Sequence, residues 1–414
     1  MFRKLLVLAT AALLFFLVAG MAAAEETEYA EDITAVCKIK TCSSPRKPAQ
    51  MTDGKYTSYW ESNKVKNPWV TVTSDTPVYG LYLCFREMPE SYEIQIGSGD
   101  SWRTVFQGDT RFHHMYYELD GVHTVRIFCT EEKTRKIGFN EIFVFGEGEV
   151  PDWVQRWEPT VEKADILFLV AHPDDELIFL GGAIPTYAVE QGKSVAVAYL
   201  SWSNTTRRSE ALNGLWTMGV RNYPVFGGFR DAYASDAKKA YKNVTGNLNE
   251  GKRRVYAWIT ELFRRYRPEV VVTHDLNGEY GHGQHKMVAD AATACFDRSG
   301  DAVQDPETAE TYGLWQVKKL YIHLYGDTEQ QTRFDWDIPL KSMDGKTGKE
   351  LAEAAYALHK TQIGAEAKIH GKNHRLSVAL FGGPDGYDNT KFGLYASIVG
   401  EDSLHTDFLE NIPE

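Results

Sequence analysis

The sequence lacks several motifs that would identify common enzyme classes. It has no G-x-S-x-G segment, which argues against a serine hydrolase with a nucleophile elbow. It has no H-E-x-x-H segment, so a helical zinc metalloprotease is excluded. The tripeptide Gly345-Lys346-Thr347 lacks the upstream glycine of a phosphate-binding loop, and we interpret it as a turn.

Basic residues are in the minority, with 45 Lys and Arg against 57 Asp and Glu, for a net charge of −12. Such a chain repels phosphate backbones, so we do not expect nucleic acid as a partner. Charged residues make up 25% and hydrophobic residues 43%, which is ordinary for a globular protein. Aromatic residues reach 13%, enough for two hydrophobic cores.

Cysteines are few, and their positions leave two interpretations open. Four of the five lie in the first third of the chain, at Cys37, Cys42, Cys84 and Cys129. They can pair in three ways, between which the sequence does not choose. Export permits disulfides, and buried free thiols are the alternative.

The apolar run that approaches membrane-spanning length stands at the N-terminus. Arg3 and Lys4 precede an apolar segment at 5–18, and the small residues 22–24 follow it. This order is typical of a secretory signal peptide, so we expect cleavage after Ala24 and an exported chain without a transmembrane segment. The alternative is an uncleaved anchor.

From residue 25 to about 150, short β-like runs alternate with turn residues. The runs are WVTVTS, YGLYLCF, YEIQIG, TVFQG, HMYYELDG, TVRIFCT and EIFVFGEG. They are rich in Val, Ile, Tyr, Phe and Thr and lack a helical apolar period, which predicts an all-β sandwich. The segment 150–165, with prolines and tryptophans, is interpreted as a linker.

After the linker, strands alternate with helices. We expect strands at 165–171, 194–201, 223–226, 270–274 and 318–324, and helices up to 191 and at 206–218, 255–266 and 350–368. The first strand is apolar throughout, as for a parallel strand buried on both faces. This order predicts an α/β, doubly wound, mostly parallel, Rossmann-like sheet. The predicted units are therefore 1–24, 25–150 and 151–414, the last with a C-terminal extension.

The segment His172-Pro173-Asp174-Asp175-Glu176 directly follows the first apolar strand and precedes a helix. In a doubly wound sheet this turn lies at the carboxyl edge, where ligand crevices form. There His172 and one aspartate can bind a metal, while the other aspartate stays free to accept a proton. The structural alternative is that the acids cap the helix and complement its dipole.

A second polar cluster follows the fourth predicted strand. It contains His274-Asp275 and the glycine-rich loop 278–285, which carries His282 and His285. The end of this strand can lie beside the end of the first, so the two clusters can meet. A histidine from this loop, His172 and an aspartate make the His₂–carboxylate set with an open position that catalytic zinc uses. The alternative is that these histidines are adventitious.

The chain resembles the PIG-L/LmbE-like N-acetylglucosaminyl deacetylases. The resemblance covers about residues 164–300, with weaker similarity to about 365, and rests on Ala171–Glu176, on Arg207-x-x-Glu210 leading into Met218-Gly219-Val220, and on His282-x-x-His285. It implies a Zn²⁺ cofactor and hydrolysis of the acetamide of an N-acetylamino sugar or glycan.

By position, the resemblance implies that His172, Asp175 and His285 bind the zinc. It implies that Asp174 is the general base and that His282 steadies the oxyanion or protonates the leaving amine. The chemistry agrees, because a metal can polarise an acetamide carbonyl and acidify water. General acid–base catalysis of this kind contributes about 10²–10⁴-fold.

The resemblance also implies two substrate-contacting residues. Arg207 matches the position of a substrate-binding arginine, although an R-x-x-E pair on a helix surface is the alternative. Asp231 corresponds more loosely to a pocket carboxylate. Bacterial thiol-pathway members of the family often carry an aspartate where Gln284 stands here, which puts the acid role of His282 in question.

The N-terminal segment resembles discoidin-type, galactose-binding-like domains, which are jelly-roll β-sandwiches. The resemblance rests on Met51–Ser62, on Trp69–Val72 and on Asn140–Ile142. In that family the two tryptophans belong to the core, so Trp60 and Trp69 are not assigned to sugar stacking. The sandwich either tethers the protein to glycans or serves as a spacer.

The predicted function is that of an exported zinc-dependent deacetylase acting on an N-acetylamino sugar. Two alternatives remain. One is a non-catalytic glycan-binding protein with a vestigial metal site, and the other is a zinc amidohydrolase acting on another amide.

Overall fold

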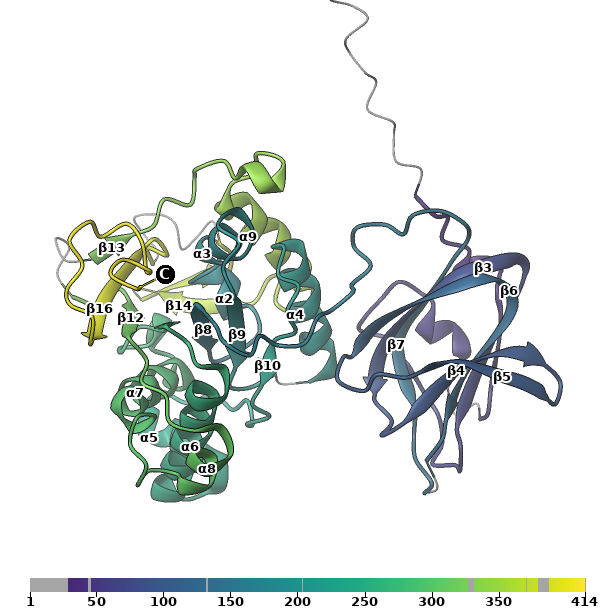
Figure 1. Ribbon diagram of the computed structural model, residues 1–414, viewed down its shortest axis with the longest axis horizontal. Helices are drawn as coiled ribbons and strands as arrows, with labels where there is room; N and C mark the ends of the chain where they lie inside the picture. Colours follow the sequence, from purple (N-terminus) through teal and green to yellow (C-terminus); the bar gives the residue numbers. More distant parts are fainter. Residues whose placement is uncertain are drawn as a thin grey trace, which may run out of the picture.

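The computed structural model describes residues 29–43, 46–131, 133–202, 204–326, 331–369, 371–378 and 387–413. The predicted signal peptide, residues 1–24, lies outside the described residues. Within them, no helix combines the length and the apolar character needed to cross a membrane. The described chain forms two bodies side by side, one built around each of two large sheets (Figure 1).

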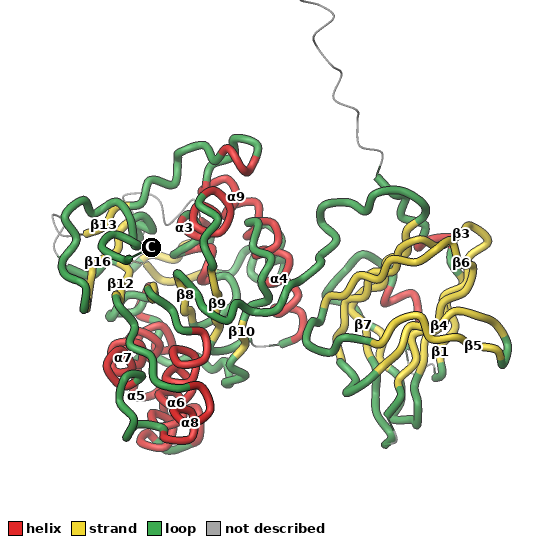
Figure 2. Tube along the Cα trace, viewed as in Figure 1, coloured by secondary structure: helices red, strands yellow, loops and turns green. Residues whose placement is uncertain are grey.

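The first body is almost entirely β structure (Figure 2). Its strands are β1 (Lys38–Thr41), β2 (Trp60–Glu61), β3 (Trp69–Glu87), β4 (Tyr92–Ser98), β5 (Ser101–Gln107), β6 (His114–Cys129) and β7 (Gly138–Phe145). They pair in the order β2-β7-β3-β6-β4-β5, with β1 added along β3. All of these pairs are antiparallel.

Two of these strands are longer than the sequence predicted. WVTVTS and YGLYLCF are parts of the single strand β3, and HMYYELDG and TVRIFCT are parts of β6. The register of the β3–β6 pair shifts between Thr73 and Val78, and Gly121 has a φ of 59°. The turn-like residues therefore make irregularities within paired strands, because a bulge bends a strand without ending its ladder.

A hydrophobic core fills this body and contains Trp60, which is fully buried, as predicted. Trp69 is only partly buried. All five cysteines lie in the described part of the chain and are free thiols. Of the two interpretations for the N-terminal cysteines, the structure therefore shows thiols.

The second body is built on a mixed sheet. Its strands are β8 (Ile166–Val170), β9 (Val195–Tyr199), β10 (Val225–Phe226), β11 (Val270–Thr273), β12 (Lys319–His323), β13 (Gln331–Arg333) and β16 (Lys391–Ser397). They pair in the order β10-β9-β8-β11-β12-β16-β13. The five predicted strands are present and run parallel, whereas the last two are antiparallel additions.

Both faces of this sheet are covered. The helices are α2 (Asp175–Ile178), α3 (Ala183–Pro185), α4 (Thr205–Thr217), α5 (Ala237–Thr245), α6 (Leu248–Tyr266), α7 (Gly283–Arg298), α8 (Pro306–Tyr312) and α9 (Gly348–Tyr356). Ile166, Phe168 and Val170 of β8 pack in a core with α2, α4 and α9. Leu167 and Leu169 pack in a second core with α5, α6 and α7. This alternation explains the continuous apolar run of the strand.

Two predicted helices are shorter than expected. The helix expected up to 191 is divided into α2, α3 and a π-helical turn, Thr186–Glu190. A Cβ on Gly182 would lie 2.6 Å from the Cβ of Trp336, so glycine permits close packing at this break. The helix predicted at 350–368 ends at Tyr356, and Glu366–Ile369 instead forms β14, which pairs with β15 (Lys372–Arg375).

The C-terminal residues contact both strand β12 and the loop that follows β11. Buried Lys319 of β12 forms an ion pair of 2.5 Å with Asp402 and donates to the carbonyl of Glu410. Tyr387 accepts a hydrogen bond of 2.5 Å from the backbone N–H of Tyr280. The tail therefore contacts the loop that carries the predicted catalytic histidines.

Helix α4 lies on the side of the second body that faces the first (Figure 1). Arg208 donates to the carbonyl oxygens of Phe85 and Arg86, at 3.1 and 3.3 Å. Arg86 in turn donates to Thr205 at 2.7 Å, and the His114 ring contacts the Ser209 hydroxyl at 3.2 Å. The two bodies are thus joined by directional polar contacts.

Candidate metal and catalytic site

The turn after β8 places the first polar cluster at the carboxyl end of the sheet. The His172 backbone N–H donates to Asp175 Oδ2 at 2.7 Å, and its ring Nδ1 lies 3.0 Å from the same oxygen. Asp174, between them, has a φ of 104°. A non-glycine residue in this conformation is strained, and such strain is concentrated at functional sites.

The second cluster lies at the end of β11, which is paired directly with β8. The loop turns at Gly278 and Gly281, both with positive φ, and leads into α7. His282 is the N-cap of α7, and its Nδ1 accepts the backbone N–H of Gln284 at 3.3 Å. His285 stands in the first turn of the helix. Chain order reverses between β8 and β11, which is where open α/β sheets form ligand sites.

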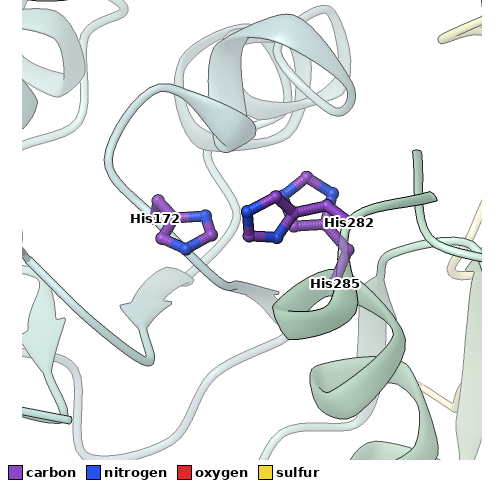
Figure 3. A group of neighbouring side chains, drawn as sticks. All are labelled: His172, His282 and His285. Carbon is purple, nitrogen blue, oxygen red and sulfur yellow. The ribbon is translucent and has the colours of Figure 1, made fainter. Parts of the chain in front are cut away.

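The two clusters meet, as the sequence predicted. Figure 3 shows His172 on one side and His282 and His285 on the other, with their rings turned toward one another. The ring centroids of His172 lie 4.9 Å from those of His282 and 5.4 Å from those of His285. One potential ligand atom from each of the three lies within 4.8 Å of the others.

Asp175 lies between the two other predicted metal ligands. Its Oδ2 is 3.0 Å from His172 Nδ1, and its Oδ1 is 3.3 Å from His285 Nε2. The ligand atoms of a tetrahedral zinc ion lie about 3.3 Å apart, so these spacings suit that ion. His285 Nε2 is buried and has no hydrogen-bond partner among the described residues. A buried lone pair of this kind suits a metal ligand.

In His172 and His285, the ring nitrogen that points away from Asp175 has a hydrogen-bond partner. His172 Nε2 contacts Gln284 Oε1 at 2.9 Å, and His285 Nδ1 contacts Glu279 Oε2 at 2.8 Å. Since these oxygens only accept, His172 Nε2 and His285 Nδ1 donate to them, and His172 Nδ1 and His285 Nε2 are the nitrogens that face Asp175. Metal-binding histidines are held in this way by partners outside the ligand set. Ligand atoms of Asp175, His274 and His285 also lie within 4.8 Å of one another, so the three predicted ligands are shared between two donor groups. Imidazole nitrogens and a carboxylate oxygen are donors that Zn²⁺ takes, so the chemistry of the donor set fits this ion.

The side chain of Asp174 contacts an arginine. Arg207 of α4 donates to Asp174 Oδ1 at 2.8 Å and to the carbonyl of Pro173. Burial raises the pKa of Asp174 to about 7, although the Arg207 guanidinium opposes this shift. Arg207 also lies 3.6 Å from Asp231, whose other oxygen is 3.5 Å from His172 Nε2. The alternative interpretation of Arg207, a surface residue paired with Glu210 on the helix, is not the arrangement seen.

Glu210 instead accepts hydrogen bonds from Thr361, at 2.8 Å from its backbone N–H and 2.6 Å from its hydroxyl. Gln284 also acts differently from the prediction. Its side chain contacts His172 and donates to the Arg230 carbonyl at 3.1 Å, and only its backbone N–H contacts His282. Burial and the neighbouring His285 lower the pKa of His282 to about 2.

The sequence analysis missed a fully buried carboxylate beside the site. Glu279 accepts from three imidazoles, those of His274, His285 and His323, each at 2.8 Å. Burial raises its pKa, but the imidazoles, His274 foremost, lower it more, so it stays well below its ordinary value. The available signal was His323, which ends the strand next to β11 and so reaches the same edge of the sheet.

An exposed aromatic side chain lies at the edge of the site and was also missed. Tyr233 is 72% exposed, and its ring centroid is 5.6 Å from that of His282. Its loop is attached to α7 through Gly283, whose N–H donates to the Ala234 carbonyl at 2.7 Å. The ring is therefore presented to solvent from an anchored segment.

Comparisons with known proteins found relatives that share one name. The chain is similar to 1D-myo-inositol 2-acetamido-2-deoxy-alpha-D-glucopyranoside deacetylases. It is 31% identical to that of Rhodococcus jostii over 38% of this chain and 60% of the relative, and 29% identical to that of Saccharomonospora viridis over 48% and 85%. The chain thus spans less than two thirds of the Rhodococcus relative.

Solved structures of two different kinds are similar to parts of the chain. An N,N'-diacetylchitobiose deacetylase from Pyrococcus horikoshii is 17% identical, covering 48% of this chain and 71% of its own, with a TM-score of 0.35. The family 32 CBM from C. perfringens NanJ, in complex with galactose, is 13% identical, covering 27% and 95%, with a TM-score of 0.23. The family model described as GlcNAc-PI de-N-acetylase matches residues 167–296. This segment, which carries both histidine clusters, is therefore a PIG-L family domain.

Proposed function

We propose that the protein is an exported, zinc-dependent deacetylase that hydrolyses the acetamide of an N-acetylamino sugar. The observation that carries this proposal is the meeting of His172, Asp175 and His285 beside Asp174. The PIG-L domain and the deacetylase names of the relatives support the reaction type. The signal-peptide pattern of residues 1–24 supports export.

His172 Nδ1, one oxygen of Asp175 and His285 Nε2 would hold the metal. A zinc ion at such a site polarises a carbonyl oxygen and makes water acidic enough to react near neutral pH. The protein orients these ligands, because Gln284 and Glu279 contact the outer nitrogens of the two histidines, at 2.9 and 2.8 Å, and so direct the inner nitrogens toward the metal position.

Asp174 is the proposed proton acceptor. It adjoins Asp175 in sequence, yet its side chain turns away from the presumed ligands and toward Arg207. It is 4% exposed, so a proton that it takes from water is retained within the site. Arg207 holds the carboxylate in place and, together with Asp231, offers polar contacts to sugar hydroxyls.

His282 is the proposed donor to the substrate. Because its Nδ1 accepts a backbone N–H, the neutral ring carries its proton on Nε2. A neutral N–H donor stabilises the oxyanion that forms on the acetamide carbonyl, and the proton that Asp174 has taken from water is the one available to the leaving amine. The backbone contact with Gln284 sets this tautomer, so the side chain of residue 284 does not.

Tyr233 is the proposed stacking contact for the sugar ring. An exposed aromatic ring beside a polar site provides a surface for the apolar face of a pyranose. We also propose that the first body, predicted as 25–150, binds glycans and keeps the second body, predicted as 151–414, near acetylated sugars. The resemblance of Met51–Ser62 and Trp69–Val72 to galactose-binding-like domains supports this division.

The test is measurement of zinc content and of acetate release from N-acetylglucosamine-containing glycans by the full chain. We expect stoichiometric zinc, acetate release that stops on chelation, and a fall of about 10²–10⁴-fold in kcat for Asp174→Asn, the range of general acid–base catalysis. Zinc without acetate release would favour hydrolysis of another amide. Absence of both, with retained glycan binding, would favour the non-catalytic alternative.

A further inference from the structure

Glu279 is placed to organise the site without taking part in the reaction. It is fully buried in the short helical turn Glu279–Gly281, and four donors surround its carboxylate. Oε2 accepts from His274 Nδ1 and His285 Nδ1, both at 2.8 Å. Oε1 accepts from His323 Nδ1 at 2.8 Å and from the backbone N–H of Asp275 at 3.1 Å. With both oxygens occupied, Glu279 is neither a metal ligand nor a proton acceptor.

Each of the three imidazoles presents Nδ1 to Glu279 and Nε2 to a different neighbour. His274 Nε2 accepts the backbone N–H of Ala171 at 3.0 Å. His285 Nε2 is buried and lies 3.3 Å from Asp175 Oδ1. His323 Nε2 contacts the carbonyl of Asp388 at 3.2 Å.

We propose that the buried carboxylate of Glu279 positions the metal ligands on both sides of the site. Through His285, it fixes the tautomer that directs Nε2 toward Asp175. Through His274, it anchors the N–H of Ala171, the residue directly before His172. His323 contacts the other oxygen and so holds the carboxylate in this orientation.

This arrangement crosses three adjacent strands. His274 follows β11, His323 ends β12, and the N–H that His274 accepts belongs to the residue after β8. A single carboxylate thus ties the carboxyl ends of β8, β11 and β12 to the first turn of α7. The inference rests on the proposed function only in taking His285 as a metal ligand, and Glu279 and His323 are positioning residues.

The test uses Glu279→Gln and Glu279→Ala in the full chain. Asp402→Asn is the matched control, because Asp402 is also a buried carboxylate paired with a cation, Lys319, in the tail that packs on β12. Zinc affinity is measured by competition with a chelator. We expect both Glu279 variants to bind zinc about 10–100-fold more weakly, as for other partners of metal-binding histidines. Asp402→Asn loses thermal stability and keeps the zinc affinity of the unchanged protein.

A second measurement does not depend on metal binding or activity. Long-range ¹H–¹⁵N spectra of the metal-free protein, labelled in its histidine rings, report the tautomer of each imidazole. We expect a single Nδ1–H tautomer for His285, and loss of this preference in Glu279→Gln. The volume of this variant is unchanged, which keeps the test valid where Glu279→Ala fails to fold.

The inference is overturned if the Glu279 variants bind zinc within twofold of Asp402→Asn, or if His285 keeps its tautomer without the carboxylate. Its failure is distinguishable from failure of the proposed function. A protein that binds no zinc refutes the proposed cofactor, while the tautomers of its metal-free form still decide the role of Glu279.

Discussion

Two groups of histidines in the protein have opposite surroundings. In the candidate site, His172, His274, His285 and His323 each contact a carboxylate, either Asp175 or Glu279. At the contact between the two bodies, His113 and His114 contact hydroxyl groups instead. His114 lies 3.0 Å from the hydroxyl of Tyr82, and His113 lies 3.0 Å from that of Tyr223.

The two groups of histidines differ in the charge of the side chains around them more than in burial. His114 and His285 are both fully buried. Burial and the positive charge of Arg208 lower the pKa of His114 to about 3 and also lower that of His113. These two rings are therefore neutral packing elements. The carboxylates of the site hold rings in defined tautomers, which is the property that metal binding needs.

The largest effect is expected from replacing one buried histidine in each group. His285→Gln should weaken zinc binding by more than about 100-fold, the upper end of the effect of removing a partner outside the ligand set, and should abolish acetate release. His114→Gln should lower the melting temperature and leave both properties in place. Zinc titration, acetate assay and thermal melting of the two variants measure this. Equal zinc affinities would remove the distinction between the two groups.

An intermediate effect is expected from pH. The pKa of His114 falls from 6.5 to about 3 on folding, so below pH 6.5 the unfolded chain binds more protons. The contribution of a neutral His114 is thus complete above pH 6.5 and is lost as the pH falls toward 3. Between about pH 7.5 and about pH 5 the melting temperature should fall less in His114→Gln than in the unchanged protein. An identical fall in both proteins would show that this ring does not control acid stability.

The smallest effect is expected from two tyrosines that each contact a histidine. Tyr233→Ala removes the exposed ring beside His282 and should raise KM for the sugar roughly 2- to 12-fold, as expected for a loss of about 0.5–1.5 kcal/mol, with kcat and melting temperature retained. Tyr233→Trp should restore KM. Tyr223→Phe removes the hydroxyl beside His113 and should lower only the melting temperature. A KM for Tyr233→Ala equal to that of the unchanged protein would exclude ring stacking.

The sequence was most informative where chemistry and position coincide in a short segment. His172, Asp174 and Asp175 follow an apolar strand directly, and His282 and His285 lie three residues apart, so pattern and spacing were sufficient to bring them together. The five parallel strands were equally accessible, because full burial leaves a continuous apolar run. Strand β16, which lies between β12 and the edge strand β13, was missed because its burial alternates irregularly.

The sequence pattern did not predict contacts between residues that are far apart in the chain. Glu279 stood in the predicted glycine-rich loop without a role, because His323 is 44 residues further along the chain. Local strand patterns also failed where a bend keeps its pairing, as in β3. The predicted helix at 350–368 failed because its amphipathic character continues past Tyr356, whereas Gly364, with a φ of 91°, turns the chain into a hairpin.

Helix α4 has a mechanical consequence for the whole molecule. Arg207 and Arg208 are consecutive, and successive helix residues point about 100° apart. Arg207 therefore donates to Asp174 in the candidate site, while Arg208 donates to the backbone of β3 in the first body. Arg208 is 5% exposed in the full chain, and removal of the β-sandwich would remove the carbonyl groups to which it donates. Arg208 is adjacent to the arginine that contacts the proposed base, so the β-sandwich helps to fix the position of helix α4. We therefore expect α4 to be held less firmly in the second body alone than in the full chain.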